Sequence, residues 1–273
     1  MEHHEYRYYK DDKQRIFRMH VEPDEFPWNP RTDMDGNIGT MFCMHSRYGL
    51  GDRTKYQDMD GLKRAVIQEL GISMKRIRSY VKTGKANIEL TYNRKERQWE
   101  IWGAYCFLGK REYGLFCANP DVEFLEDDLI AGITLNDLQK ISNDNLVILP
   151  LYLYDHSGLS MSCADFGDPW DSGQVGIIWT TIDRVKAARL GKQTKKEWIR
   201  MAEQDMRAEV KMYNMYLQGE AYGYIEERQS EDGQWEECDS CWGFYTDTFD
   251  PLCELADEIW GPGTYTEELP EAA

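Results

Sequence analysis

The chain has 273 residues, of which 41% are hydrophobic and 13% aromatic, and its formal net charge is −17. This composition excludes an intrinsically disordered chain, because it provides a substantial core for one large domain or two small ones. No run of about 18 apolar residues occurs and the N-terminus lacks the apolar centre of a secretion signal, so we expect a cytoplasmic protein with no membrane partner.

Hydrophobic patterning predicts an α+β fold, with an antiparallel sheet and helices packed on it. Residues 5–21 are typical of a strand hairpin, and residues 22–38 carry three prolines and have the composition of a loop. Helical spacing of apolar residues over 60–81 predicts a helical region. Residues 86–116 predict two or three antiparallel strands, with a turn at Gly109-Lys110.

The clearest predicted helix is a long amphipathic one over residues 195–217. Thr194 and Glu197 have the spacing of a capping box at its start. Two short helices are predicted before it, over 134–141 and 181–190. Six apolar side chains fall on one face of the long helix, which we interpret as a core-facing stripe: Trp198, Ala202, Met206, Val210, Tyr213 and Leu217.

The C-terminal part predicts a hairpin, from residues 221–225 and 234–245, and then a short helix over 250–260. Residues 261–273 have the composition of an acidic, flexible tail. We therefore expect a single α+β domain over 1–260, within which residues 1–130 could form an N-terminal subdomain.

The acidic residues are concentrated near the C-terminus. Residues 219–273 hold 16 acidic residues and one basic residue, Arg228, whereas the rest of the chain is nearly neutral. Such a surface repels nucleic acid and attracts basic protein surfaces, so we expect no direct nucleic-acid binding. Two interpretations of this acidity stay open, namely solubility and mimicry of a phosphate backbone.

Seven cysteines, an odd number, are scattered through the chain, which indicates reduced thiols. Cys238 and Cys241 form a lone CxxC, and a zinc site would need two more ligands. Cys43 and Cys163 each have a histidine nearby in sequence, but a reactive thiol needs a base close in space and a lowered pKa. We interpret the cysteines as structural residues and expect no metal and no cofactor.

Two sequence blocks hold most of the residues that could form a site. The first is Asn37–Asp52 (NIGTMFCMHSRYGLGD), and the second comprises Leu151–Gly158 (LYLYDHSG) and Pro169–Gly176 (PWDSGQVG). They resemble the signatures of a family of largely uncharacterised proteins of bacteriophages and conjugative elements. Asp239–Phe244 (DSCWGF) resembles a strand near the end of those proteins. The resemblance implies a protein of a phage or mobile element that acts inside the bacterial cell.

The first block of that family reads N-x-G-T-M-x-C-x-H-x-R-Y-x-L-G-D. The positions of this chain that match it are Asn37, Gly39, Thr40, Met41, Cys43, His45, Arg47, Tyr48, Leu50, Gly51 and Asp52.

The polar residues of the two blocks form the candidate site. They are His45, Arg47, Asp52, Asp155, His156, Asp171 and Gln174. Two histidines with two or three carboxylates could hold a divalent metal or perform acid–base chemistry. The alternative is structural: Arg47 and Asp171 form an ion pair, and the histidines bond backbone carbonyls. The adjacent Asp155, His156 and Ser157 do not form a triad, because neighbouring residues on a strand point to opposite faces.

We favour a binding protein over an enzyme. It would inhibit or redirect a host factor, such as restriction or CRISPR machinery, by covering a basic, nucleic-acid-binding surface with Glu226, Glu227, Glu236 and Glu237. The alternative is a metal-dependent or acid–base hydrolase, or a nucleotide-modifying enzyme. Its catalytic residues would be His45, Asp155, His156 and Asp171. A third hypothesis is a structural protein of the mobile element. The sequence predicts no oligomeric state.

Overall fold

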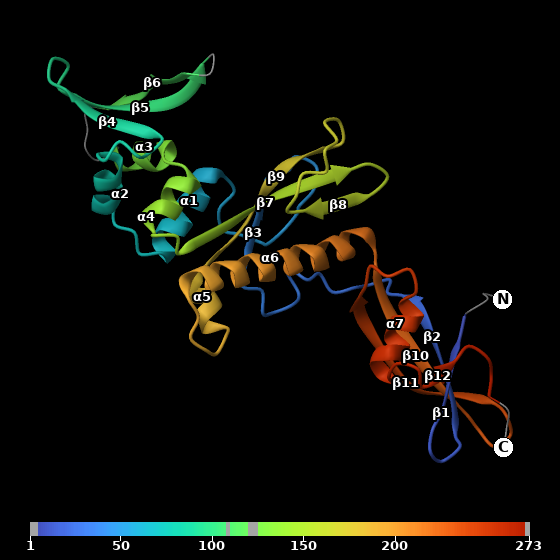
Figure 1. Ribbon diagram of the computed structural model, residues 1–273. Helices are drawn as coiled ribbons and strands as arrows, with labels where there is room; N and C mark the ends of the chain where they lie inside the picture. Colours follow the sequence, from blue (N-terminus) through green and yellow to red (C-terminus); the bar gives the residue numbers. More distant parts are fainter. Residues whose placement is uncertain (1–4, 108–109, 120–124, 271–273) are drawn as a thin grey trace. The chain divides into compact units, whose positions relative to one another are not determined.

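The computed structural model describes residues 5–107, 110–119 and 125–270 (Figure 1). Its helices and antiparallel sheets confirm the α+β class. None of the described helices is long and apolar enough to span a membrane.

The chain divides into two compact units. Unit 1 comprises Met1–Asn37, Leu151–Gln174 and Arg207–Ala273, and unit 2 comprises Ile38–Pro150 and Val175–Met206. Neither unit coincides with residues 1–130, and the expectation of one domain over 1–260 stays a prediction.

Unit 2 combines short helices with a three-stranded sheet. The helices are α1 (Met59–Glu69), α2 (Met74–Val81), α3 (Leu125–Gly132), α4 (Leu135–Ile141) and α5 (Ile182–Ala187). The strands are β4 (Ile88–Asn93), β5 (Gln98–Phe107) and β6 (Lys110–Asn119), in the order β4-β5-β6. Residues 86–116, predicted as two or three antiparallel strands, therefore contribute to three. Of the predicted turn, Gly109 lies outside the described residues and Lys110 begins β6.

One apolar cluster fills unit 2. Leu62 and Val66 of α1 meet Leu129 of α3 in it, together with Ile88 and Ile101 of the sheet. These side chains are almost completely buried because helical and strand periodicity place them on inward faces. The fold therefore follows the hydrophobic pattern closely in this unit.

A buried lysine joins two of these helices. Lys63 Nζ donates to the backbone oxygens of Ile130 at 3.1 Å and Ala131 at 2.7 Å, at the end of α3. A cation is favourable there, because the last carbonyl groups of a helix carry partial negative charge. Lys63 thus satisfies carbonyl groups that the helix itself leaves without partners.

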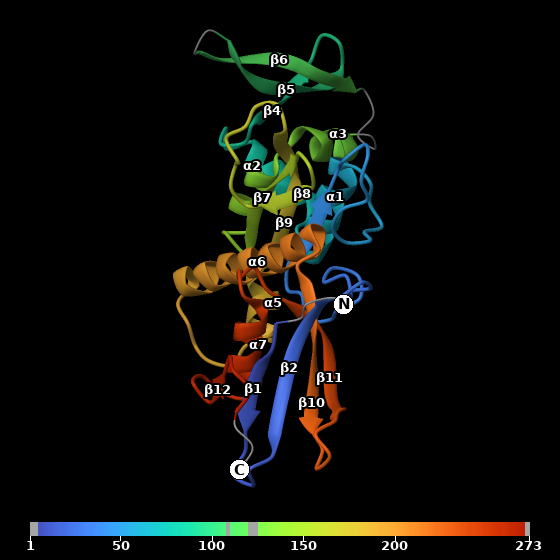
Figure 2. The ribbon, with the colours of Figure 1, turned by 90° about the vertical axis from the view of Figure 1, so that its right-hand side faces the viewer.

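Unit 1 is built on a five-stranded antiparallel sheet of order β11-β10-β2-β1-β12. The strands are β1 (Arg7–Lys10), β2 (Ile16–Pro23), β10 (Ala221–Gln229), β11 (Trp235–Tyr245) and β12 (Tyr265–Thr266). Figure 2 shows β1, β2, β10 and β11 side by side. Helix α7 (Pro251–Ile259) packs on one face, where Met19 and Tyr224 meet Leu252 and Leu255.

Strand β12 lies within the segment predicted as a flexible tail. Tyr265 pairs with Tyr9 and Thr266 with Tyr8 of β1. The Tyr265 hydroxyl bonds Asp257 at 2.8 Å, and its ring lies 6.3 Å from that of Trp260. These contacts depend on tertiary structure, which composition alone does not show. Residues 271–273 of the predicted tail lie outside the described residues.

The predicted long helix is confirmed as α6 (Lys195–Gln218). Thr194 and Glu197 form the predicted capping box, with a 2.7 Å bond from the Thr194 backbone N–H to Glu197 Oε2. Five residues of the predicted stripe are buried: Trp198, Ala202, Met206, Val210 and Tyr213. Leu217 is only half-buried, near the end of the helix.

The second sequence block lies around three further strands. The two parts of the block fall at the end of β7 (Leu146–Asp155) and at the start of β9 (Ser172–Thr181), and β8 (Leu159–Ser162) lies between these strands in the chain. In unit 1, β8 pairs antiparallel with the last part of β7. In unit 2, β9 pairs antiparallel with β3 (Thr40–Cys43), which belongs to the first block.

Candidate functional site

The first sequence block folds back on itself in unit 2. Asp52 closes the turn, because its Oδ2 accepts the Met41 N–H at 3.0 Å and its own N–H donates to Met41 O at 3.0 Å. Gly51 has φ +76°, and a Cβ there would lie 2.8 Å from Met41 O. Gly51 and Asp52 therefore hold the loop against β3.

His45 is held by the backbone of its own loop. Its Nδ1 accepts the N–H groups of Arg47 and Tyr48, both at 3.3 Å, and its ring stacks on Tyr48 at 5.1 Å. A neutral imidazole that accepts at Nδ1 carries its proton on Nε2. The Nδ1 atom therefore accepts from N–H groups, and the expectation that the histidines bond backbone carbonyls stays a prediction.

The side chains of this block border an open hollow of about 700 Å³. It is lined by Phe42, Cys43, Met44, His45, Ser46, Asp52, Arg53, Thr54, Tyr56 and Gln57. Burial raises the pKa of the Tyr56 hydroxyl, which is therefore protonated at neutral pH. Arg47 is not among the lining residues, and its guanidinium carbon lies 5.8 Å from the Tyr48 ring centroid.

The two blocks meet through the backbone inside unit 2. Cys43 is paired with Gly176, and the Met44 N–H donates to Val175 O at 2.7 Å. A Cβ on Gly176 would lie 2.0 Å from Phe42 O, closer than any side chain tolerates. The last glycine of the second block is therefore required by the close approach of the first block.

The remainder of the second block lies in unit 1 and contains an exposed histidine–aspartate pair. His156 Nδ1 lies 3.2 Å from Asp171 Oδ2, and the two side chains are 63% and 40% exposed. The Asp155 N–H donates to Asp171 O at 2.8 Å. Because Nδ1 faces the carboxylate, the Nε2 atom of His156 is the ring nitrogen that could exchange a proton.

Asp168 fixes the loop that carries Asp171. Its Oδ1 accepts the N–H groups of Trp170 at 2.8 Å and Asp171 at 3.0 Å, and these bonds lower the pKa of Asp168. Gln174 is exposed on β9. Ser157 adopts a left-handed conformation with φ +61°, in the turn between β7 and β8.

Cys163 and Cys238 lack the environment of activated thiols. Burial raises the pKa of Cys163, against the opposite effect of Arg207. Burial and the Glu226 carboxylate raise the pKa of Cys238 to about 11. A raised pKa leaves little thiolate at neutral pH. Within residues 5–107, 110–119 and 125–270, no three His, Cys, Asp or Glu side chains are grouped as metal ligands.

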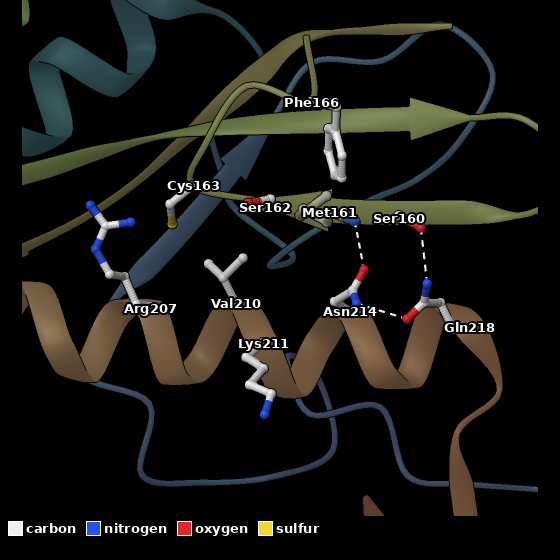
Figure 3. A pocket seen from close by; sticks show the side chains of 10 residues that line it. All are labelled: Ser160, Met161, Ser162, Cys163, Phe166, Arg207, Val210, Lys211, Asn214 and Gln218. Carbon is white, nitrogen blue, oxygen red and sulfur yellow. Dashed lines mark hydrogen bonds between the residues drawn. The ribbon is translucent and has the colours of Figure 1, made fainter. Parts of the chain in front are cut away.

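Figure 3 shows a groove within unit 1 where the C-terminal half of α6 lies alongside β8. Asn214 Oδ1 accepts the Met161 N–H at 2.7 Å, and Gln218 Nε2 donates to Ser160 Oγ at 2.9 Å. Asn214 Nδ2 in turn donates to Gln218 Oε1 at 2.8 Å. Both amides therefore anchor the helix to the strand and are not free to bind a ligand.

This groove has a volume of about 360 Å³. Arg207 and Cys163 lie at one end, while Lys211 points away from β8 (Figure 3) and pairs with Asp247 at 2.9 Å. Arg207 is consequently the cationic lining residue that lies nearest to Cys163. This site could not be predicted from the sequence, because Asn214 and Met161 are 53 residues apart and neither belongs to a motif.

The four glutamates expected to face a partner fall into two pairs. Glu227 accepts from Arg18 at 2.6 and 2.9 Å, and Glu226 accepts from Trp260 Nε1 at 3.0 Å. Both are half-buried on β10, and their carboxylates make contacts within unit 1. Glu236 and Glu237 are exposed on β11. Only this second pair, among the four, is freely presented to a partner.

Arg18 is the centre of an aromatic cluster that the sequence did not predict. Its guanidinium carbon lies 4.5 Å from the Tyr6 ring centroid and 4.4 Å from that of Trp235, while Glu227 holds it from one side. A guanidinium suits this position because it is planar and stacks on aromatic rings. The alternation of Tyr6 and Tyr8 in the sequence could have indicated an aromatic face on this strand. That Trp235 belongs to the same cluster follows only from the register of β10 and β11.

No protein-family model matches the chain, and neither a curated protein nor a solved structure matches it.

Proposed function

We propose that this protein is a binding protein of a bacteriophage or mobile element, acting in the cytoplasm of the host cell. It inhibits or redirects a host factor, of the restriction or CRISPR type, by covering a basic surface that otherwise binds nucleic acid. The resemblance of the two blocks supports the biological setting, and the acidic surface of unit 1 supports the mode of action.

The observation that carries the proposal is the outer strand β11. It is 11 residues long and forms one edge of the five-stranded sheet. Residues 236–242 are all exposed, and they include Glu236, Glu237 and Asp239. Glu237 accepts the Ser240 hydroxyl at 3.1 Å, and Glu236 lies 3.9 Å from Arg228. These carboxylates are available for charge-assisted bonds to a partner.

The physical consequence is electrostatic steering. Exposed carboxylates attract a basic surface over roughly a Debye length, which is about 8–10 Å at physiological ionic strength. They increase the rate of association and make binding weaken as salt rises. A partner whose nucleic-acid site is covered in this way cannot bind nucleic acid at the same time.

The test is capture from host lysate by the tagged full chain, followed by elution with double-stranded DNA. We expect a basic protein to be retained by the native chain and released by the DNA. Glu236→Gln/Glu237→Gln should abolish most of this retention. Glu89→Gln/Glu96→Gln, an exposed pair on and after β4, changes the net charge equally and should leave it intact. Equal retention by both variants would contradict the proposal.

A second candidate function, acid–base catalysis, is favoured by the His156–Asp171 pair. The carboxylate would orient the imidazole and stabilise its protonated form, so that Nε2 acts as a base. A hydrolase or nucleotide-modifying enzyme of this kind should lose at least about a hundredfold in activity on His156→Ala. A screen of nucleotide and ester substrates that shows no turnover above the His156→Ala background would rule it out.

A further inference from the structure

A second hollow in unit 1, of about 580 Å³, opens beside the end of β2. It is lined by Val21, Glu22, Pro23, Asp24, Glu25, Phe26 and Trp242. Three of these side chains are carboxylates and two are large aromatic rings, and none of them is basic. The hollow therefore combines negative charge with exposed π surfaces.

A glycine on the neighbouring strand places the indole ring. Gly223 of β10 is paired with both Trp242 of β11 and Glu22 of β2. A Cβ on Gly223 would lie 2.2 Å from Cε3 of Trp242, so the ring occupies the space that a side chain would fill. Trp242 nevertheless stays 46% exposed. One surface of the indole is thus supported by the sheet while another is available to a ligand.

The other groups are held close to this ring by the loop after β2. Asp24 Oδ1 accepts the Phe26 N–H at 3.0 Å, and the Asp24 N–H donates to Ala221 O at 2.8 Å. Phe26 is 85% exposed despite this anchoring. Glu22 lies 3.4 Å from His20 Nε2, and Glu25 is exposed. A ligand that covers the Phe26 ring would gain hydrophobic free energy beside the Asp24 carboxylate, which the loop holds in place.

We propose that this hollow binds an arginine side chain presented by the basic partner. The inference rests on the proposed function and names the anchoring contact. A guanidinium is planar, stacks on an indole, and donates to carboxylates at its edge. The rings of Trp242 and Phe26 supply the stacking surfaces, and Glu22 and Glu25 supply the acceptors. A neutral side chain of the same shape would gain neither the cation–π attraction nor the charge-assisted bonds.

The test uses the full chain labelled with ¹⁵N and two pentapeptides. One is acetyl-Gly-Ser-Arg-Ser-Gly-amide, and the other has citrulline, a neutral isostere, in place of arginine. The indole N–H resonance of Trp242 is assigned by its loss in Trp242→Phe. We expect it to shift saturably with the arginine peptide and not with the citrulline peptide. An absent shift, or equal shifts with both peptides, would overturn the assignment.

Matched variants distinguish specific binding in the hollow from non-specific attraction of the peptide to the acidic surface. Trp242→Ala and Gly223→Ala should weaken the arginine peptide roughly three- to tenfold. Trp170→Ala, an exposed tryptophan outside the hollow, and Gly103→Ala, a strand glycine whose Cβ would be 3.8 Å from its nearest neighbour, should not. Glu22→Gln/Glu25→Gln should weaken binding more than Glu231→Gln/Glu258→Gln. Equal effects of test and control variants would contradict the proposal.

The two proposals fail separately. If the peptide does not bind but capture from lysate still depends on Glu236 and Glu237, the arginine site is wrong and the proposed function stands. If the peptide binds as expected but capture is insensitive to those two glutamates, the arginine site stands and the mode of action proposed for β11 is wrong.

Discussion

The two units of this chain differ most in charge. Unit 1 contains 30 acidic and 9 basic residues, a formal net charge of −21, whereas unit 2 contains 19 acidic and 23 basic residues, a net charge of +4. The acidity of the chain therefore belongs to one unit, which gathers segments from the beginning, the middle and the end of the sequence. Because the negative charge is concentrated in one unit, that unit carries a strong negative electrostatic potential. This distribution favours the interpretation of the acidity as a binding surface over the interpretation that it only confers solubility.

The interiors of the two units also differ in polarity, and unit 1 is again the more charged of the two. Unit 2 is organised around the apolar cluster that includes Leu62 and Leu129. Unit 1 places an ion pair in its interior, since Arg31 Nη1 lies 2.7 Å from Glu209 Oε2 and the two side chains are 1% and 13% exposed. Arg7 likewise pairs with Asp250 at 2.9 Å. The acidic unit thus depends on specific polar pairs that cross long stretches of sequence.

The largest effect is expected in unit 2, for Gly176→Ala. The new Cβ would lie 2.0 Å from Phe42 O, so β3 and β9 would have to separate. We expect a loss of roughly 3–5 kcal/mol in the free energy of unfolding, measured with denaturant. Gly173→Ala, on the same strand with nothing within 4 Å of its Cβ, is the control and should cost about 1 kcal/mol or less. Equal losses would show that the approach of β3 is not tight.

The next effect tests the polar interior of unit 1. Glu209→Gln leaves the Arg31 guanidinium buried without its carboxylate and should cost about 3 kcal/mol of unfolding free energy. Arg31→Met/Glu209→Leu removes both charges and should regain most of that loss. A double variant less stable than Glu209→Gln would contradict this account of the interior, because the pair would then contribute more than an apolar replacement.

A smaller effect is expected at the aromatic cluster of unit 1. Trp235→Ala removes one of the two rings that contact Arg18 and should cost about 1–2 kcal/mol in unfolding free energy. Trp170→Ala is the matched control, since that side chain is 92% exposed, and it should stay within about 0.5 kcal/mol of the native chain. If both variants lose equally little, the cluster adds no stability to the sheet.

The smallest effect concerns the reactivity of Cys238 and leaves stability nearly unchanged. Its pKa is raised to about 11, so the thiolate fraction at pH 8 is roughly a hundredfold below that of an ordinary thiol. Alkylation by iodoacetamide at pH 8, followed by mass spectrometry, should be correspondingly slow and should accelerate as the pH rises towards 11. Glu226→Gln removes a carboxylate that favours the thiol form and should speed alkylation at pH 8. An unchanged rate would show that Glu226 does not affect the thiol.

The sequence predicted what is local in this fold. Thr194 and Glu197 identified the start of α6, and the pattern of residues 86–116 identified antiparallel strands that the structure shows as β4, β5 and β6. It could not predict strand β12, because Tyr265 and Thr266 pair with Tyr9 and Tyr8, which lie at the opposite end of the sequence. The Arg31–Glu209 pair could not be predicted either, because the two residues are 178 positions apart in the sequence.

The candidate site was predicted in part for the same reason. Motif spacing identified His156 and Asp171, which the structure brings within 3.2 Å. The direction of each glutamate was not predictable, because register shifts between β10 and β11 decide which side chains face outwards. Glu226 and Glu227 consequently serve the sheet, while Glu236 and Glu237 stay exposed. The contribution of Trp242 depended on an opposing glycine, Gly223, that belongs to no motif.

The most direct test of the central claim is the salt dependence of affinity for the captured host factor. The native chain should bind it tightly at about 50 mM salt and much more weakly at about 200 mM. Glu236→Gln/Glu237→Gln should reduce the low-salt affinity by roughly tenfold and flatten the salt dependence, and Glu89→Gln/Glu96→Gln should change neither. If the β11 variant keeps the native affinity and the native salt dependence, the acidic edge of unit 1 is not the binding surface.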